Sequence, residues 1–551
     1  MGGMKPRWGA AFVVLFIVAL WGCGPVALRR YLERMTGFEG FIFVSVADGS
    51  DGNRGVLGEP LATIQAGIDT AYTYIEEGLA DAVEVHVAAG TYEVRDEEGD
   101  FIDMKEGVSL YGGYSLDFKT RNPTVYVTTI EDTSTGGTEI AAVRACDGIT
   151  EATVLDGFTI LGGGGTTMDG WSTALDIERA SPTVTNNTII GGSASPTGYT
   201  IALDIYDDSS PLIDHNAIVG GNAQGHNYGI TVSLDSFPTI RSNTINGGSS
   251  GISQGIFIFD AGAMIQNNSI EGGQGTTTRG IFINVSSWVS IKGNTVSGGS
   301  ATGESSGILV MSENVTVEAN TIYAGYSASW GTYGVHCVNV TLFTVRNNTI
   351  LGGETGGTGG ANGVLCNASS GLIFDNTIAG GIGEWGPGIT LISSSAPLVE
   401  NNIIFSSSTS GGYCIHEGDD NGGYAASIRN NTLWDVTGTT VLYCTYDGQT
   451  LDTAAAVNAL DHADGNWDQN PDLADLDGAD DDLATVEDND WHLTAVSPVE
   501  ARQGGRDGAA LSWGFITDKD GATRTNLTQG PNDGPSNDGA AGWSMGACEQ
   551  D

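Results

Sequence analysis

The chain has 551 residues, and its 67 Asp and Glu residues against 21 Lys and Arg residues give a formal net charge of −46. This charge excludes a surface that binds nucleic acid or anionic lipid, and it repels acidic polysaccharides. Hydrophobic residues make up 40% of the chain, which is enough for a packed core and excludes wholesale disorder.

The first 22 residues have the organisation of an export signal. Lys5 and Arg7 precede the apolar run AAFVVLFIVALWG, which is too short to span a bilayer comfortably. The sequence LWGC at 20–23 resembles the signal of bacterial lipoproteins, in which the cysteine becomes the lipidated first residue. The resemblance implies lipidation at Cys23, a tether over 23–40, and an exported protein held at the outer membrane or cell surface. The alternative is an ordinary secretory signal with an incidental cysteine.

A cap region with the first coils is expected over 41–150. Within it, apolar residues recur at helical spacing from Leu61 to Leu79, and Pro60 stands at the start. This pattern predicts a helix that covers exposed strand edges at the N-terminal end of a repeat.

One asparagine recurs every 25 to 29 residues through the middle of the chain. The positions are Asn187, Asn216, Asn243, Asn268, Asn294, Asn320, Asn348, Asn376, Asn402 and Asn431. An aliphatic residue stands three positions before each asparagine and another two positions after it. Short β-branched segments bounded by glycine predict two strands per repeat.

A third strand is predicted about a dozen residues before each asparagine, in segments such as ALDIE, GIFIF and GVHCV. Alternation directs every second residue of these segments, Leu175 and Ile256 among them, to the inside. Three short strands per coil predict an all-β fold, a parallel β-helix over 151–445. The asparagines are expected in a tight bend, in the left-handed backbone conformation, with their amides hydrogen-bonded from coil to coil. A leucine-rich repeat would need Leu-x-x-Leu-x-Leu, which is absent.

The repeat resembles the right-handed parallel β-helices of the pectin-lyase-like superfamily. The segments at 46–71, 85–93 and 107–115 resemble the uncharacterised domain that opens many secreted β-helix proteins. The segments NPDLAD, WHLTAVSPVEA, DKDGATRT and SMGACE resemble the closing segment of bacterial surface β-helices, which implies an irregular acidic closing region over 446–551. The resemblance implies a fold and a location, and it does not specify a chemistry.

The basic residues of the repeat do not suggest a lyase, which would need a Lys or Arg base beside carboxylate-bound Ca²⁺. Arg241, Lys292, Arg346 and Arg429 all stand two positions before a ladder asparagine. The same column holds Asp214, Glu318 and Glu400. Opposite charges on neighbouring coils predict cross-strand ion pairs.

Two acidic clusters are candidate sites. Asp176 and Asp204 occupy one outward column on adjacent coils, and Asp207 is close in sequence. Stacked carboxylates repel, so full solvation, a Ca²⁺ site, or a hydrolase acid/base pair with raised pKa values are the alternatives. A second cluster contains Asp475, Asp477, Asp480 and Asp482, whose hard oxygen ligands suit Ca²⁺ as well as a solvated loop.

An outward stripe on the third strand is apolar. It comprises Phe257, Phe259, Phe282, Leu309, Met311 and His336. Either the loops after Gly299 or Gly353 cover it, or it is a platform for a glycan or a partner protein.

Two cysteine pairs are separated by about one coil. They are Cys337 with Cys366 and Cys414 with Cys444. The coil spacing lies within the Cα range of a disulfide, and stacked free thiols are the alternative.

These features together favour a lipid-anchored surface protein that binds a glycan or another surface protein without catalysis. The alternatives are a hydrolase or lyase acting on a neutral or cationic polysaccharide, and a structural envelope protein with no ligand. Calcium is the one cofactor considered, the membrane is contacted through the lipid, and nucleic acid is not expected as a partner.

Overall fold

The computed structural model describes residues 40–95, 99–136, 139–165, 171–194, 198–406, 412–418, 425, 427–435, 441–471, 473–475 and 490–493. Two compact units interleave along the chain. Unit 1 comprises Met1–Tyr92, Met104–Thr129 and Ala152–Phe158, and unit 2 comprises Glu93–Asp103, Ile130–Glu151 and Thr159–Asp551. The signal peptide, Cys23 and nearly all of the tether lie outside the described residues. Among the described residues, no helix is both long enough and apolar enough to cross a membrane.

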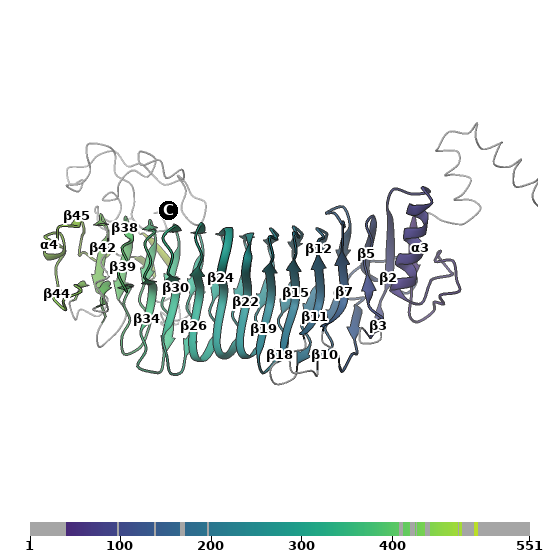
Figure 1. Cartoon of the computed structure of the whole chain (residues 1–551), viewed down its shortest axis with the longest axis horizontal. Coiled ribbons are helices and arrows are strands. Elements are labelled where there is room, and N and C mark those ends of the chain that lie inside the picture. The colour runs from purple at the N-terminus through teal and green to yellow at the C-terminus, as the bar shows by residue number, and fades with distance from the viewer. Residues whose placement is uncertain are drawn as a thin grey trace, which may run out of the picture. The chain divides into compact units, whose positions relative to one another are not determined.

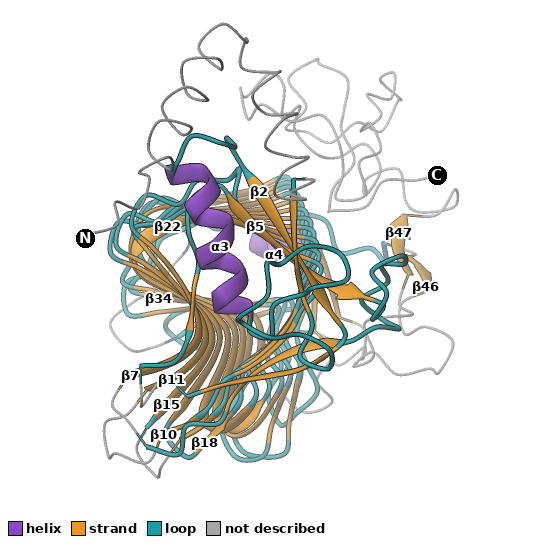
Figure 2. Ribbon diagram, turned by 90° about the vertical axis from the view of Figure 1, so that its right-hand side faces the viewer, coloured by secondary structure: helices purple, strands orange, loops and turns teal. Residues whose placement is uncertain are grey.

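Unit 1 is a parallel sheet with one helix packed on it. Its strands are β1 (Phe41–Val44), β2 (Val83–Ala88), β5 (Val108–Tyr114) and β8 (Val154–Asp156), paired in that order. Helix α3 (Ile64–Glu76) contacts β1 and β2 (Figure 2). The predicted helix is confirmed, although it starts after Thr63, whose hydroxyl accepts from Ala66 N–H at 3.2 Å. Gly67 allows the close approach, because a Cβ there would lie 2.6 Å from the Val44 side chain.

Unit 2 is a stack of coils with three main rows of parallel strands (Figure 1). Several coils add a two-residue strand to a fourth row, as at β14 (Ser193–Ala194) and β18 (Asn222–Ala223). The row of long strands is β7 (Glu139–Cys146), β11 (Trp171–Glu178), β15 (Tyr199–Tyr206), β19 (His226–Ser233), β22 (Ser249–Gln266), β24 (Gln274–Lys292), β26 (Ser300–Met311), β30 (Thr332–Val338), β34 (Ala361–Asn367), β37 (Ile389–Ile392), β40 (Ile415–Glu417) and β43 (Tyr443–Cys444). We call it the long-strand row. Strands β22 and β24 continue without a break into the second row.

The other two rows are shorter. The second row is β12 (Thr183–Thr185), β16 (Leu212–Asp214), β20 (Thr239–Arg241), β27 (Val315–Glu318), β31 (Phe343–Arg346), β35 (Leu372–Phe374), β38 (Leu398–Glu400) and β41 (Ser427–Arg429). The third row in unit 2 is β9 (Thr159–Leu161), β13 (Thr188–Ile190), β17 (Ala217–Val219), β21 (Thr244–Asn246), β23 (Ser269–Glu271), β25 (Thr295–Ser297), β28 (Thr321–Tyr323), β32 (Thr349–Leu351), β36 (Thr377–Ala379), β39 (Ile403–Ser406) and β42 (Thr432–Asp435). The predicted three-strand β-helix is confirmed.

The core of unit 2 is a set of aliphatic columns that run from coil to coil. Leu175, Leu203, Ile230, Ile256 and Ile281 are buried on the long strands, as the alternation predicts. The aliphatic residues on either side of each ladder asparagine, such as Val184 and Ile189, are buried too. Each fully buried Leu or Ile side chain contributes roughly 1.5–3 kcal/mol, so the stacked columns are the main source of stability.

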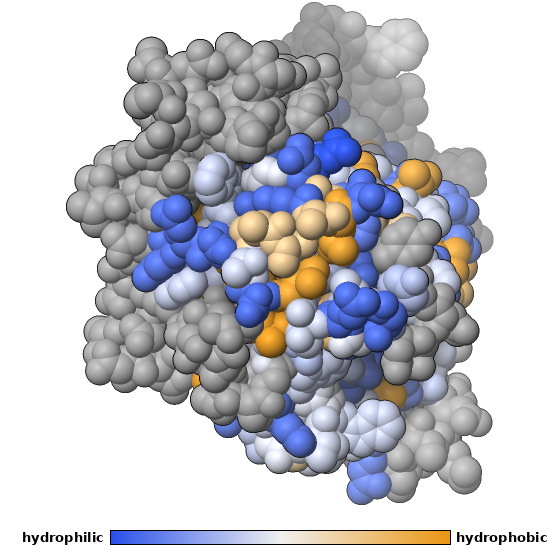
Figure 3. All heavy atoms as spheres, turned by 90° about the vertical axis from the view of Figure 1, so that its left-hand side faces the viewer, coloured by the Kyte–Doolittle hydropathy of each residue, from blue (hydrophilic) through white to orange (hydrophobic). Residues whose placement is uncertain are grey.

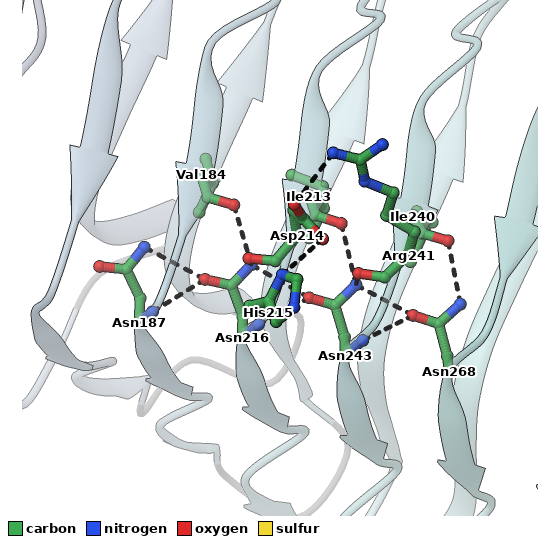
Figure 4. Close-up of polar contacts among 10 residues, drawn as sticks. All are labelled: Val184, Asn187, Ile213, Asp214, His215, Asn216, Ile240, Arg241, Asn243 and Asn268. Atoms are coloured by element: carbon green, nitrogen blue, oxygen red, sulfur yellow. Dashed lines mark hydrogen bonds and ion pairs between the residues drawn. The ribbon is translucent and has the colours of Figure 1, made fainter.

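The asparagine ladder is confirmed (Figure 4). The backbone N–H of Asn216 donates to Oδ1 of Asn243 at 2.8 Å, and Nδ2 of Asn216 donates to the same oxygen at 3.1 Å. The same amide also donates to the carbonyl oxygen of Val184 on the preceding coil, at 2.9 Å. The pattern continues to Asn466, an additional member whose Oδ1 accepts from Asn431.

The prediction that the ladder asparagines adopt the left-handed conformation is wrong by one residue. The residue before each ladder asparagine has φ between 53° and 68°. These residues are Asn186, His215, Ser242, Asn267, Gly293, Ala319, Asn347, Asp375, Asn401 and Asn430. The left-handed residue turns the chain, which leaves the next asparagine free to direct its side chain inward.

The charged column beside the ladder forms the predicted ion pairs at Asp214 and Glu318, whereas Glu400 and its register partner Arg429 form none. Arg241 Nη2 lies 3.1 Å from Asp214 Oδ2, and Glu318 receives Lys292 Nζ at 2.8 Å and Arg346 Nη2 at 2.6 Å.

The predicted disulfides are not formed, because all five described cysteines are free thiols. Cys337 and Cys366 are register partners on parallel strands, where a spacing of about 4.8 Å exceeds the Cβ separation of a disulfide. Cys444 pairs in register with His416 rather than with Cys414.

The C-terminal end of unit 2 carries β44 (Thr450–Leu451), the short helix α4 (Ala454–Val457) and β45 (Ala463–Asp464). Figure 3 looks onto this end and shows an apolar patch surrounded by hydrophilic residues. Further along the chain, β46 (Leu473–Asp475) pairs antiparallel with β47 (Asp490–Leu493). The remaining part of the predicted closing region lies outside the described residues.

Candidate functional site

The outward face of the long-strand row brings the candidate residues together. One column of register partners runs through Arg144, Asp176, Asp204, Thr231, Phe257, Phe282, Leu309 and His336. Its first part is acidic and its second part is aromatic or apolar. The column is set by strand alternation, because successive residues of a strand point to opposite faces of the sheet.

A pocket of about 400 Å³ lies at the acidic end, lined among others by Arg144, Trp171, Asp176, Asp204 and Tyr206. The Tyr206 hydroxyl donates to Asp176 Oδ2 at 3.3 Å, and the Thr231 hydroxyl donates to Asp204 Oδ1. Both carboxyl groups are half-buried rather than exposed. The interpretation that the pair is fully solvated is therefore wrong.

Burial changes the protonation of this pair. Desolvation, with repulsion from Asp204 as the next cause, raises the pKa of Asp176 to about 7. Desolvation also raises the pKa of Asp204 to about 6, and the hydrogen bond from Thr231 opposes that rise. The charge of Arg144, the register partner of Asp176, lowers the pKa of Asp176 but does not cancel the burial. Near neutral pH the pair therefore holds about one proton between two carboxyl groups.

Asp207, the third catalytic candidate, does not join this pair. It lies in a turn with φ of 57° and forms an ion pair with Arg179. The same guanidinium also binds Glu178, and it binds Asp147 Oδ1 at 2.6 Å. Arg179 thus neutralises a solvent-facing acidic cluster beside the pocket.

The predicted calcium site at Asp176 and Asp204 is not found as a cluster of ligands. Among the described residues, no three His, Cys, Asp or Glu side chains converge closely enough to hold a metal ion. The side chain of Asp475 and the residues Asp477, Asp480 and Asp482 lie outside what the structure describes.

A continuous row of rings follows the acidic pocket along the same face. It comprises Trp171, Tyr199, His226, Tyr228, Phe257 and Phe282, with 4.9 to 6.1 Å between the centroids of successive rings. We call it the aromatic row. It begins at the pocket, which Trp171 lines, and spans five successive long strands from β11 to β24. Trp171, Tyr199, His226 and Tyr228 were not predicted as site residues, because they lie in other columns than the one that contains Asp176 and Phe257.

The predicted apolar stripe is only partly exposed. Phe259 and Met311 are 41% and 38% exposed, whereas Leu309 is 4% exposed. Phe257, Phe282 and His336 are half-buried. The prediction of exposure fails at Leu309 because Phe282 and His336 flank it in the same column on the neighbouring coils.

Polar groups without partners lie beside the aromatic row. Gln254, Arg279 and Ser306 are register partners in one outward column on β22, β24 and β26. Gln254 Oε1, Arg279 Nε, Ser306 Oγ and both ring nitrogens of His336 are buried and make no hydrogen bond to any described residue. The sequence signal for this cluster is a basic residue directly before the glycine of TTRGIFI.

Comparisons with known families agree with this fold. The description "Right handed beta helix region" matches residues 279–451, and a family described as a protein of unknown function, DUF1565, matches residues 47–255. The chain is a right-handed parallel β-helix protein whose fold is consistent with the pectin-lyase-like superfamily. No curated protein matches it.

Solved structures share the fold at low identity. The A-module of mannuronan C-5 epimerase AlgE4 from Azotobacter vinelandii is 18% identical, over 69% of this chain and 93% of its own, with a TM-score of 0.39. The Dettilon tailspike protein is 14% identical, over 70% and 68%, with a TM-score of 0.40. The Streptococcus pneumoniae surface protein and adhesin PfbA is 15% identical, over 69% and 98%, with a TM-score of 0.37. At these identities the likeness concerns the fold alone.

Proposed function

We propose that this protein is exported to the cell surface and binds a glycan chain along the outward face of its long-strand row, without cleaving it. The observation that carries the proposal is the aromatic row, which runs along the coil axis for five strands. Ring faces pack against the apolar C–H faces of sugars, and neighbouring polar groups hydrogen-bond to the hydroxyls. At about 4.8 Å per coil, the row offers contacts over a span of roughly 19 Å.

The test is a glycan array followed by titration calorimetry with the best ligand. The variant Phe257→Ser, Phe282→Ser removes the last two rings of the aromatic row, and we expect at least a tenfold loss of affinity with an unchanged circular dichroism spectrum. Tyr446→Ser is the matched control, because this exposed tyrosine lies at the C-terminal end of unit 2. If the double variant binds as tightly as the wild type, the row is not the binding surface.

A second function, glycoside hydrolysis, is favoured by the acidic pocket. Asp176 and Asp204 are register partners, and their raised pKa values suit one protonated and one ionised carboxyl near pH 6.5. Strand spacing is close to the carboxyl separation of about 5–5.5 Å in retaining glycosidases. Binding remains the preferred function because it accounts for the whole aromatic row, whereas hydrolysis would use only its end. Reducing ends released by the wild type but not by Asp176→Asn would establish the enzyme instead.

Attachment through a lipid at Cys23 belongs to the same proposal. Its support is the sequence signal at 20–23. Wild-type protein expressed in a bacterial host should incorporate labelled palmitate and sediment with membranes, whereas Cys23→Ser should do neither. Equal labelling of both proteins would contradict lipidation at this cysteine.

A further inference from the structure

We propose that the glycan carries isolated anionic substituents, carboxylate or sulfate ester, and that Arg279 binds one of them. This inference rests on the proposed function, because it names the chemistry of the ligand on the same face. The geometry of Arg279 and of the unpartnered polar groups around it carries the inference.

Arg279 is a half-buried cation with no anionic partner. Its guanidinium carbon lies 5.0 Å from the centroid of the Phe282 ring, and its side chain makes no ion pair or hydrogen bond with any described residue. Burial lowers the pKa of Arg279, which shows that water is partly removed from the charge. A desolvated charge without a partner costs free energy, and an arginine fork matches the oxygens of a carboxylate or sulfate.

Three other basic residues of the coils have the anionic partner that Arg279 lacks, and Arg429, which has none among the described residues, is exposed to solvent. Arg241, Lys292 and Arg346 each form an ion pair with a carboxylate of a neighbouring coil. In a chain with 67 acidic residues, an intramolecular partner for Arg279 would have been easy to provide. Among the carboxylates of the described residues, Glu304 on the next strand β26 acts on Arg279 electrostatically, and it does so without an ion pair.

The surroundings of Arg279 suit a ligand rich in hydroxyl groups. Gln254 and Ser306 flank it in register and carry buried polar atoms without partners. Its charge also acts on His226 and His336, whose pKa values are lowered first by desolvation and then by Arg279. The pKa of His336 falls to about 4, so this ring is neutral at pH 7, and one of its nitrogens can donate a hydrogen bond while the other accepts one. A ligand hydroxyl that pairs with one of these buried groups removes the free-energy cost of leaving that group without a hydrogen bond.

The charge of the rest of the chain limits the ligand to a sparse anion. The net charge of −46 repels a polyanion at long range. Asp204 also stands three coils before Arg279, about 14 Å away along the axis. A glycan with one acidic group between neutral sugars places its charge on Arg279 and its neutral part on the aromatic row.

The experiment uses an array of oligosaccharides in matched pairs, each acidic glycan beside its carboxyl-reduced or desulfated form. Wild-type protein should bind the acidic member of the best pair at least tenfold more tightly than the neutral member. Arg279→Gln should lower the affinity for the acidic member to that for the neutral member, and Arg279→Lys should lose part of the preference. Arg429→Gln is the matched control, because this exposed arginine on β41 also lacks an ion pair among the described residues. Circular dichroism and thermal melting verify that each variant is folded.

Each outcome of the experiment tests a different part of the proposal. Equal binding of both members by the wild type, with no effect of Arg279→Gln, overturns the anionic ligand and leaves glycan binding intact. Absence of binding to every member overturns the proposed function and this inference together. If desulfation but not carboxyl reduction removes binding, the substituent is a sulfate ester, and the reverse result identifies a carboxylate.

Discussion

At the scale of single residues, Asp176 and Asp204 couple the stability of unit 2 to pH. Their pKa values in the folded protein, about 7 and about 6, lie above that of an exposed aspartate. The folded state therefore binds more protons than the unfolded state between about pH 4 and pH 7. It follows that stability falls as the pH rises through this window.

Replacing one carboxyl of the pair should remove this loss of stability at high pH. We expect Asp176→Asn to raise the free energy of unfolding at pH 8 by on the order of 1–2 kcal/mol, and to leave it nearly unchanged at pH 4. Urea unfolding at pH 4, 6 and 8 measures the difference. The exposed Asp452→Asn is the control, and a gain of the same size there would contradict the role of burial.

The left-handed residue before each ladder asparagine offers a second test. Ala319 has φ of 55°, where an L-residue is strained, whereas the equivalent residue one coil earlier is Gly293. Ala319→Gly should therefore stabilise the fold by roughly 0.5–1 kcal/mol, seen as a higher midpoint of thermal unfolding. Gly293→Ala should do the opposite, since its Cβ would lie 2.5 Å from Asn267 Oδ1. A lower midpoint for Ala319→Gly would contradict the strain at this position.

The asparagine doublets show what the sequence could predict at this scale. In TNNT and RNNT, the periodic pattern correctly identified the second asparagine as the ladder residue. It assigned the left-handed backbone to that residue as well, although Asn186 and Asn347 adopt it. Both residues of a doublet have the same chemistry, so only the backbone geometry separates the residue that turns the chain from the one that bonds between coils.

At the scale of elements, the ion triplet Lys292–Glu318–Arg346 ties β24, β27 and β31 together. Glu318 is half-buried, and desolvation alone would raise its pKa, but the two cations hold that pKa below its usual value. The ion pairs of Glu318 stabilise the folded state fully above the pKa that a glutamate has in the unfolded chain. This stabilisation is lost as the pH falls through the lower pKa of Glu318 in the folded protein. The triplet therefore stabilises the coils at neutral pH and fails in acid.

Glu318→Gln should lower the free energy of unfolding at pH 7 by about 1–2 kcal/mol, with a smaller difference near pH 3. Glu400→Gln is the matched control, because its register partner Arg429 forms no ion pair with it. Urea unfolding of both variants measures the effect. Equal losses in the two variants would mean that the cations contribute nothing.

A second buried polar column lies on the long strands and was not predicted. It contains Ser172, Thr200, Ser253, Thr278, Ser305 and Thr332. Ser172 donates to the carbonyl oxygen of Gly163 at 2.6 Å, and Thr332 donates to that of Gly352 at 2.6 Å. Several of these hydroxyls satisfy carbonyls at or beside the glycine turns, and the Thr278 hydroxyl donates to Ser305 Oγ at 3.0 Å. The repeat pattern did not reveal this column because its residue type changes from coil to coil, whereas every ladder position is an asparagine.

The sequence predicted which columns of the long strands carry the candidate site. It did not predict how deeply each side chain in those columns is buried. Alternation correctly directed Asp176, Phe257 and Phe282 outward. Exposure depends on which side chains stand on the adjacent coils, and Leu309 is buried because large neighbours flank it. The aromatic row also crosses between columns, as at His226 and Tyr228, so no single column of the sequence contains it.

At the scale of the whole molecule, the net charge of −46 opposes folding through self-repulsion. We expect the midpoint of thermal unfolding to rise by several degrees as NaCl increases from about 10 mM to about 200 mM, because the Debye length shortens from roughly 30 Å to below 10 Å. Differential scanning calorimetry measures the rise. An unchanged or lower midpoint would show that the screened ion pairs outweigh the repulsion.

Calcium can be separated from screening in the same experiment. CaCl₂ and NaCl at equal ionic strength should give similar midpoints if screening alone acts. A markedly higher midpoint in CaCl₂ would indicate specific binding, for which the acidic stretch with Asp477, Asp480 and Asp482 is the first place to examine.

The ladder allows coils of unequal length to stack without loss of register. The distance between successive members is 25 residues from Asn243 to Asn268 and 35 residues from Asn431 to Asn466, yet every step makes the same pair of bonds to the next amide oxygen. The asparagine therefore marks where one coil can be exchanged for another. Removing residues 349–376 as one block, for example, would bring Asn348 against Asn402 with the pattern of bonds intact. A gene that duplicates or loses such a block changes the length of the binding face in whole coils, which gives this fold a simple route to ligands of different length.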